Sequence, residues 1–413
     1  MQEHRFFSIT MKKLFTVISI LFMCITSQAQ YNQEFVEILS HFNADSIGKT
    51  IQDLENFGNR YCNEGNGNKD VAEYVVTRMQ SYGIENATVD SFFLNLDLGW
   101  LPSISRYCYN AKGSIEGVGC PDSTIIIGAH LDAITLDDYW TLQATAPGAD
   151  DNASGVAVML EIARIIHQFN LESRYTLSFV GFDAEEVGLR GAGHDAEQRY
   201  QRQEKILAML NNDMVANQPE SLPYKLTLHW YENATDLAER AAFLCETFTS
   251  ITPVIPSANE NTLCQNSDSW TYAQYGYPAV FAIEYYFSDY YHTEEDLFIH
   301  CNLNFAKEVA QMNFALLYEM TFGPLGDATN ITENPKLAIR CYPNPTSNII
   351  NFQSSEAING FKITLYDLTG RIVKSTFSNN DKILLNISDL ENGIYIAEIE
   401  IEGKKTTEKI IKN

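Results

Sequence analysis

The sequence is poor in basic residues: 28 Lys and Arg stand against 53 Asp and Glu, which gives a formal net charge of -25. Residues 1–29 carry a net +2 and residues 335–413 a net +1, so the segment between them carries -28. An acidic body of this size repels phosphate backbones and argues against nucleic-acid binding. It suits a site that collects divalent cations, although an ordinary soluble acidic surface gives the same charge.

Cysteine motifs and long apolar runs are also missing. None of the eight cysteines forms a C-x-x-C pair, so a zinc site built from cysteines is not expected. Seven cysteines remain beyond residue 29, and proximity along the chain makes Cys108 with Cys120, and Cys245 with Cys264, the candidate disulfides. No stretch beyond residue 29 is long and apolar enough to span a bilayer, so we expect no transmembrane segment in the mature chain.

Residues 1–29 have the pattern of a secretory signal peptide. Lys12 and Lys13 precede an apolar run from Leu14 to Ile25, and small and polar residues follow that run. The apolar run is too short for a comfortable transmembrane span. This pattern predicts that the mature protein is exported, either as a secreted protein or as one held at the cell surface.

Hydrophobic periodicity predicts an α/β domain over residues 30–322, with a largely parallel central sheet, because strands alternate with helices. The helix after residue 154 has Ser154 as its expected N-cap. The expected strands are 88–96, 124–129, 175–182, 225–230 and 279–283. The expected helices are 33–54, 69–82, 155–169, 187–199, 234–249 and 303–318.

The composition and the hydrophobic pattern of the sequence change after Phe322. Residues 323–338 are rich in Gly, Pro, Asn and Thr, which is typical of a linker. From residue 339 to residue 413, short alternating strands are separated by turn residues such as Asn392 and Gly393. These residues therefore predict a small all-β sandwich domain, within the lower size range for independent folding.

Potential metal ligands follow the predicted buried strands. Open α/β sheets gather their sites at the carboxyl ends of the strands, and a set of two histidines with several carboxylates is one that zinc accepts. Any one of these residues alone could be an ordinary loop or cap residue, so the case rests on their conjunction. The candidates are His130, Asp132, Asp151, Glu185, Glu186, Asp213 and His292.

The chemistry of this set favours two metal ions rather than one. Two divalent cations need a bridging carboxylate, for which Asp151 is the natural candidate, and further ligands on each ion. His130 and Asp213 can complete one ion, and Glu186 and His292 the other. Glu185 is then free to act as the general base on a water molecule.

Asp132 lies two residues after His130 in the sequence. We expect its carboxylate to accept the imidazole N–H of His130 and so fix the tautomer of the ring.

Five segments, H-L-D, D-D-N-A-S-G, F-D-A-E-E-V-G-L-R-G-A, N-N-D-M and Y-H-T-E-E-D, occur in this order. Together they resemble the M28 family of metallopeptidases, which are zinc aminopeptidases and their relatives, over roughly residues 45–320. The resemblance implies a three-layer α/β/α fold with a mixed sheet and two co-catalytic zinc ions. Its ligand pattern falls on the same residues: His130, bridging Asp151, Glu186, Asp213 and His292, with Glu185 as general base.

The chain departs from the family pattern near the predicted site. Many aminopeptidases of this family carry S-D-H where this chain has Ser267, Asp268 and Ser269, which puts a substrate contact in doubt rather than the metal site. An aromatic segment around Tyr291 leads into His292 and suggests a pocket for a bulky apolar side chain, although ordinary core and rim aromatics fit equally well. We expect Tyr291 to polarise the substrate carbonyl.

The C-terminal residues resemble a type IX secretion sorting domain, over roughly residues 340–413. The motifs are Y-P-N-P-T from Tyr342, L-Y-D-L-T-G-R from Leu365, L-E-N-G-I-Y from Leu390 and K-I-I-K from Lys409. The resemblance implies a bacterium of the Bacteroidetes type and passage across the outer membrane by the type IX secretion machinery. The alternative is a β-sandwich module that binds carbohydrate or protein, but no aromatic platform stands out on its strands.

Together these features predict a secreted co-catalytic di-zinc exopeptidase, an aminopeptidase that removes N-terminal residues from peptides. Two other functions remain open for the same fold. One is a glutaminyl cyclase with a single zinc ion, against which His130 and the D-D-N-A-S-G loop argue. The other is a non-catalytic surface binding protein, which lost ligands would signal; none is lost here.

Overall fold

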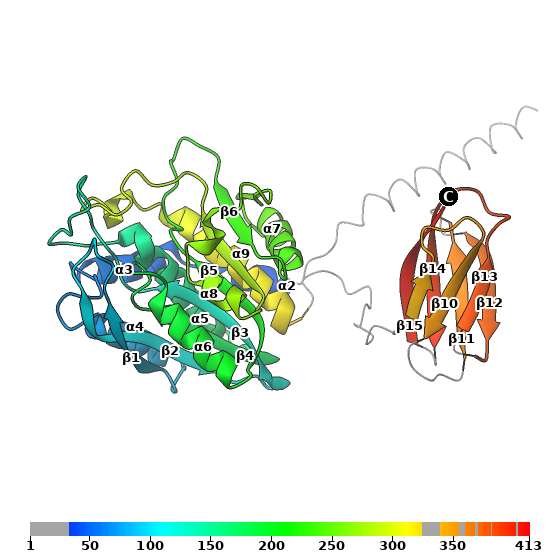
Figure 1. Cartoon of the computed structure of the whole chain (residues 1–413), viewed down its shortest axis with the longest axis horizontal. Coiled ribbons are helices and arrows are strands. Elements are labelled where there is room, and N and C mark those ends of the chain that lie inside the picture. Colours follow the sequence, from blue (N-terminus) through cyan, green and yellow to red (C-terminus); the bar gives the residue numbers. More distant parts are fainter. Residues whose placement is uncertain (1–32, 324–338, 355–359, 368–370, 381, 402–403) are drawn as a thin grey trace, which may run out of the picture. The chain divides into compact units, whose positions relative to one another are not determined.

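The computed structural model describes residues 33–323, 339–354, 360–367, 371–380, 382–401 and 404–413. The chain divides into two compact units, Met1–Asp327 and Ala328–Asn413 (Figure 1). The predicted signal peptide and all but the first residue of the predicted linker lie outside the described residues.

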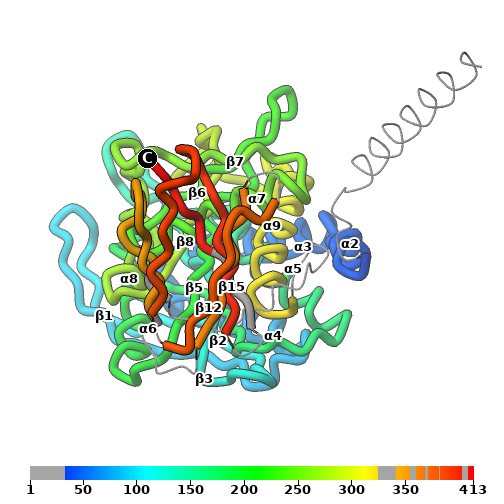
Figure 2. Tube along the Cα trace, turned by 90° about the vertical axis from the view of Figure 1, so that its right-hand side faces the viewer, coloured from blue at the N-terminus to red at the C-terminus, as the bar shows by residue number. Residues whose placement is uncertain are grey.

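An eight-stranded mixed sheet forms the centre of the first unit, in the order β1-β2-β4-β3-β5-β8-β6-β7. The four central strands β4, β3, β5 and β8 are parallel, and their neighbours β2 and β6 run antiparallel to them. The labels of β6, β8 and β5 follow one another from top to bottom in Figure 2, in the order of the sheet. The strands are β1 Thr88–Leu96, β2 Ile104–Ile115, β3 Cys120–His130, β4 Tyr175–Phe182, β5 Lys205–Asn212, β6 Lys225–Trp230, β7 Thr252–Val254 and β8 Ala279–Glu284.

Helices cover both faces of this sheet. Alternate residues of β3 separate the two faces, because Ile125 and Ile127 belong to one buried cluster and Ile126 to another. The first cluster includes α2 Gln33–Ser40, α3 Ala44–Glu55, α4 Lys69–Ser81, α5 Gly155–Gln168, α7 Thr235–Phe248 and α9 Leu303–Thr321. The second includes α6 Arg190–Gln201 and α8 Ser269–Gln274. None of the helices among the described residues is long and apolar enough to cross a membrane.

Three helix starts differ from the prediction. The expected helix 33–54 is two helices, because the Asn43 side chain accepts from the backbone N–H of Asp45 at 2.7 Å and caps α3. The expected helix 187–199 begins only at Arg190, after Leu189 in the left-handed conformation. Ser154 is not an N-cap: its backbone is already helical, and its hydroxyl donates to the Asp150 carbonyl at 2.7 Å.

The seven cysteines of the described residues are free, and the strand arrangement separates the expected pairs. Cys108 lies in β2, whose neighbours are β1 and β4, whereas Cys120 begins β3. Cys245 and Cys264 belong to the clusters on opposite faces of the sheet. Cys108 instead shares a small apolar cluster with Cys62.

The second unit is built from antiparallel strands in two sheets, β13-β10-β9 and β12-β11-β14-β15. Residues from both sheets, such as Phe352 and Ile399, form one buried cluster, so the unit is a β-sandwich. Residues 368–370 of the L-Y-D-L-T-G-R motif lie outside the described residues. The strands are β9 Ile339–Tyr342, β10 Ile349–Ser354, β11 Phe361–Tyr366, β12 Ile372–Ser378, β13 Lys382–Asn386, β14 Gly393–Ile401 and β15 Lys404–Lys412.

Candidate metal centre

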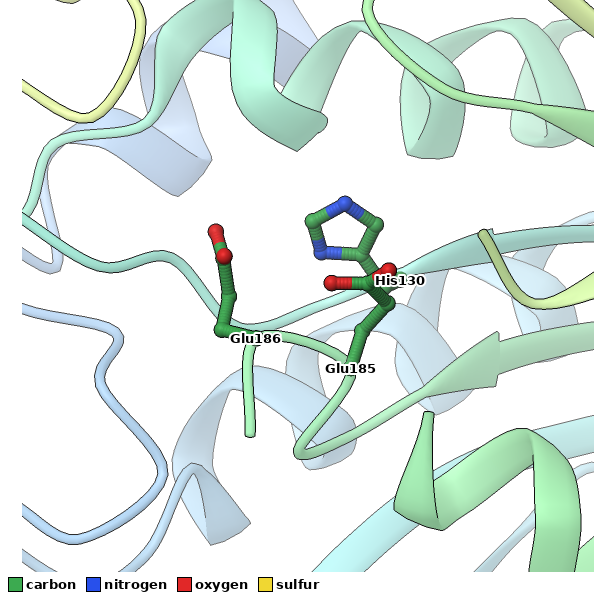
Figure 3. Close-up of side chains that lie close together, drawn as sticks. All are labelled: His130, Glu185 and Glu186. Atoms are coloured by element: carbon green, nitrogen blue, oxygen red, sulfur yellow. The ribbon is translucent and has the colours of Figure 1, made fainter. Parts of the chain in front are cut away.

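The parallel strands bring the predicted ligands to one edge of the sheet. His130 is the last residue of β3, Glu185 and Glu186 follow the end of β4, and Asp213 directly follows β5. Because these three strands are parallel neighbours, their carboxyl ends meet. Figure 3 shows the result for three of the side chains: His130 at the end of β3 lies beside Glu185 and Glu186 of the loop after β4.

The five predicted ligands form two groups that share Asp151. His130 Nε2 lies 3.1 Å from Asp151 Oδ1 and 3.2 Å from Asp213 Oδ1. His292 Nε2 lies 3.3 Å from Asp151 Oδ2 and 2.8 Å from Glu186 Oε2. The two oxygens of one carboxylate therefore face the two histidines, and the ligand atoms of each group lie within 4.8 Å of one another.

The side chains of this centre leave buried polar atoms unpaired, and their chemistry fits a bound cation. Among the described residues, His292 Nε2 and Glu186 Oε1 are buried and have no hydrogen-bond partner. Buried polar atoms are normally satisfied, so unpartnered atoms on two residues of one ligand group indicate that the group binds a further partner. Imidazole nitrogen and carboxylate oxygen are ligands that zinc accepts, and the donor set therefore fits zinc.

The electrostatics also favour added positive charge. Burial raises the pKa of Glu186 to about 7, and burial holds the pKa of Glu185 well above its usual range. Burial lowers the pKa of His292, but the carboxylates of Glu186 and Asp151 together outweigh it and raise that pKa to about 10. These shifts have one physical meaning: the buried centre holds more negative charge than it can balance, so it stabilises a cation placed among its carboxylates.

Glu185 stands apart from the two groups that share Asp151. Its side chain clusters with His130 and Glu186, and the residue is only 8% exposed. Its backbone N–H donates to Asp132 Oδ1 at 2.9 Å, and that of Glu186 donates to Asp132 Oδ2 at 3.2 Å. The Asp132 carboxylate thus fixes the loop that presents both glutamates.

The contact between Asp132 and His130 differs from the expected one. His130 Nδ1 lies 3.0 Å from the backbone carbonyl of Asp132 and 3.7 Å from its carboxylate. The carbonyl is therefore the nearer acceptor for the imidazole N–H, because the carboxylate is turned toward the backbone of the two glutamates. Asp132 orients both the histidine and the glutamate pair.

The D-D-N-A-S-G segment is explained by its contacts with β5. The Asn152 side chain donates to the Asn212 carbonyl at 2.9 Å and accepts from the Gly155 N–H at 2.9 Å. A Cβ on Gly155 would lie 2.2 Å from the Asn212 carbonyl oxygen, so only glycine fits at this point. The start of α5 is thereby held against β5, with Asp151 beside Asp213.

Two supporting residues were not predicted from the sequence. Asp296 accepts from the backbone N–H groups of Asp150 and Asp151 at 2.9 and 3.0 Å and so holds the shared carboxylate in place. Ser267 donates to Asp213 Oδ2 at 2.6 Å. Asp296 is the last residue of the Y-H-T-E-E-D motif, which could have drawn attention to it.

Arg60 connects the two loops that carry His130 and Asp151. Its guanidinium donates to the carbonyls of Leu131 at 2.9 Å and Gly148 at 2.7 Å, and also to that of Pro147. The side chain is fully buried, and this burial lowers its pKa to about 10 despite the nearby carboxylates. Nothing in the sequence around Arg60 indicated this role.

Replacing Arg60 by Met should destabilise the first unit by about 3–5 kcal/mol, because several buried carbonyls would lose their charged donor. The change is measured by urea unfolding of the metal-free protein. Arg106→Met is the matched control, since Arg106 is part-exposed and, within the described part of the chain, its side chain donates only to the Gly65 carbonyl. An equal cost for the two substitutions would contradict the clamp role of Arg60.

Two cavities meet at the centre. A small one of about 90 Å³ is lined by His130, Asp151, Asp213 and the apolar residues Met214, Leu263, Phe281, Ile283 and Phe287. A groove of about 540 Å³ opens on the other side, over the segment before α6 and over α8. Glu185, Glu186 and Tyr291 line both, and the Tyr291 ring stacks on His292 with 3.7 Å between ring centroids. A third cavity of about 560 Å³, at the amino ends of β3 and β4, is remote from the centre.

Comparison with known families agrees with this geometry. The model of peptidase family M28 matches residues 110–317. The chain belongs to peptidase family M28. The model of the secretion system C-terminal sorting domain matches residues 340–413. The expected family, and the expected α/β fold with an additional C-terminal β domain, are therefore confirmed.

Relatives and solved structures place this M28 chain among aminopeptidase-like proteins. A probable leucine aminopeptidase of Arthroderma otae is 26% identical over 298 residues, 70% of this chain and 75% of that protein. A probable zinc metalloprotease of Pyrenophora teres f. teres is 33% identical over 202 residues, 45% of this chain and 42% of that protein.

Two solved structures share the fold. The LapA aminopeptidase of Legionella pneumophila superimposes with a TM-score of 0.56 at 20% identity, over 72% of this chain and 78% of that one. The Bacteroides thetaiotaomicron glutaminyl cyclase bound to N-acetylhistamine has a TM-score of 0.55 at 18% identity, over 67% of this chain and 98% of that one. Aminopeptidases and a cyclase thus share this architecture, so the fold alone does not choose between them.

Proposed function

We propose that this M28 peptidase is an exported di-zinc aminopeptidase that removes N-terminal residues from peptides. The observation that carries the proposal is the pair of ligand groups that share the Asp151 carboxylate. A single metal ion needs only one such group, whereas a carboxylate that faces a histidine on each side suits a bridge between two ions.

In this proposal, His130 and Asp213 hold one zinc ion, Glu186 and His292 hold the other, and Asp151 bridges them. Bound zinc supplies Lewis-acid chemistry, which polarises a carbonyl and makes water more acidic. Glu185 accepts a proton from the attacking water and delivers it to the departing amine. Burial, which raises the pKa of Glu185, makes this side chain a stronger base than an exposed glutamate.

The rest of the site orients the substrate. The small apolar cavity beside the ligands suits an apolar side chain on the N-terminal residue of the peptide. The surrounding carboxylates favour the positive charge of its α-ammonium group. Tyr291 borders both cavities, where its hydroxyl is available to polarise the scissile carbonyl. This combination favours an aminopeptidase over a carboxypeptidase.

Export follows from the two ends of the chain in this proposal. The sorting domain at residues 340–413 is recognised by the type IX secretion machinery, after residues 1–29 have directed the chain across the inner membrane. The peptidase then acts on peptides outside the cell, either released or held at the surface.

Metal analysis together with a substrate screen tests the function. We expect about two zinc ions per chain, and hydrolysis of leucyl-aminomethylcoumarin that a chelator abolishes and added zinc restores. N-acetylation of the substrate should prevent cleavage, because it removes the α-ammonium group. Hydrolysis that persists in excess chelator would contradict the proposal.

The shared fold with a glutaminyl cyclase makes that activity the second candidate. About one zinc ion per chain, with pyroglutamate formed from peptides that begin with Gln, would establish the cyclase instead. Fully metallated protein that acts on neither class of substrate would point to a binding protein without catalysis.

A further inference from the structure

The two cavities at the centre are unequal in size and chemistry. The small one is lined by apolar side chains beside the ligands and has room for one side chain of the substrate. The groove is about six times larger, at 540 Å³ against 90 Å³. An enzyme that removes single N-terminal residues needs a short pocket before the scissile bond and an open path after it, which is the asymmetry seen here.

The groove is lined by neutral polar groups. Gln265, Asn266 and Gln274 contribute carboxamides, and Trp270 contributes an indole. Among the described residues, the side chains of Gln265 and Gln274 have no hydrogen-bond partner, and both are exposed. A carboxamide donates and accepts, so it can pair with the N–H and C=O groups of an extended peptide.

The groove lining offers little to balance a negative charge, because its one basic group, His292, is a zinc ligand in the proposed function. Among the described residues, the lining contains no Lys or Arg, and its acidic groups are Glu185 and Glu186, which also line the small cavity. Arg190 lies beside Gly188 of the lining, but its guanidinium donates to the Val187 carbonyl at 3.1 Å. The metal-loaded centre adds no net positive charge that could attract a carboxylate. Two divalent cations carry +4, and the four carboxylates around them carry -4: Asp151, Glu185, Glu186 and Asp213. The buried Asp132 carboxylate and the buried Arg60 guanidinium carry opposite charges and offset one another.

We propose that this groove binds the part of the peptide that follows the scissile bond, and that it selects against a free carboxylate on the first residue after that bond. The inference rests on the proposed aminopeptidase function and names its substrate class. Peptides of three or more residues, and dipeptides with an amidated C-terminus, are the substrates. Free dipeptides are poor substrates, because their carboxylate would lie in the groove, close to Glu185 and Glu186, without a counter-ion.

Matched substrates test the selection. The value of kcat/KM for Leu-Gly-amide should exceed that for Leu-Gly by at least about tenfold, since like charges at a site discriminate strongly. Leu-Gly-Gly-Gly should be cleaved as well as the amide. Equal values for the acid and the amide, with chelator-sensitive hydrolysis of leucyl-aminomethylcoumarin intact, would overturn the inference and leave the aminopeptidase function standing. Hydrolysis of none of these substrates would overturn the function itself.

A charge introduced into the groove provides a second test. Gln274→Lys should lower the ratio of amide to acid by at least about threefold, because the new ammonium group balances the dipeptide carboxylate. Gln201→Lys is the charge-matched control: Gln201 is exposed at the far end of α6, and its side chain donates a hydrogen bond to Glu197. The same fall in both variants would indicate a general charge effect and overturn the groove assignment.

Binding can be measured without turnover. In the Glu185→Gln variant, calorimetric titration should show tighter binding of Leu-Gly-amide than of Leu-Gly, and Gln274→Lys in that background should reduce the difference. Equal affinities in both backgrounds would overturn the proposed recognition, whatever the rates of hydrolysis.

Discussion

Glu185→Gln should lower kcat for leucyl-aminomethylcoumarin by about 10²–10⁴-fold, the usual contribution of a general base, while the zinc content stays unchanged. Gln has the same shape as Glu but no basic oxygen. The structural support of the loop is retained, because Asp132 binds the backbone N–H of residue 185 rather than its side chain. The measurement is steady-state kinetics on protein whose zinc content has been determined by mass spectrometry.

Two control variants distinguish the loss of a base from the loss of zinc. Glu186→Gln should lose zinc as well as activity, because this carboxylate faces His292 at 2.8 Å. Glu197→Gln on the exposed side of α6 should change neither quantity. Near-normal turnover by fully metallated Glu185→Gln protein would refute the role of Glu185 as the base.

Asp151→Asn should have the second large effect, a loss of at least one zinc ion per chain. One oxygen of Asp151 faces His130 and the other faces His292, so the substitution weakens both ligand groups. Changes outside the ligand set already lower metal affinity by about 10–100-fold, and the loss of the shared carboxylate should exceed that. We expect zinc affinity, measured by competition with a fluorescent chelator, and kcat to fall together.

A buried carboxylate outside the centre supplies the control. Asp195 is buried against Arg199 and Tyr272, so Asp195→Asn should cost stability and leave the zinc content unchanged. If Asp151→Asn protein retained two zinc ions at wild-type affinity, Asp151 would not be a bridge, and the two-ion proposal would fail with it.

The ligand set could be proposed from the sequence because it depends on local patterns. Apolar runs in the sequence predict buried strands. A polar residue directly after such a run therefore lies at the edge of the sheet. His130, after the expected strand 124–129, is of this kind, whereas Asp213 is proposed from the N-N-D-M segment because β5 is not among the expected strands. Parallel pairing then brings them together without further information.

The supporting residues could not be proposed because their partners are distant in sequence. Arg60 reaches Leu131 and Gly148, and Asp296 reaches Asp150 and Asp151, across 71 to 146 positions. Such contacts depend on the packing of loops, for which sequence periodicity gives no signal. Ser154 illustrates the same limit, since a good capping residue is used here to bind the Asp150 carbonyl and the Val215 N–H.

The position of the Arg60 guanidinium also indicates where the chain tolerates changes in sequence. Residues 132–146 form an excursion between β3 and the D-D-N-A-S-G segment, and the residues that flank it, Leu131 and Pro147, are bound by the same side chain. The tip of the excursion, around Tyr139 and Trp140, is highly exposed. Insertions or replacements at this tip should therefore leave the distance between His130 and Asp151 unchanged. The tip is a suitable place to insert new sequence without altering the metal centre.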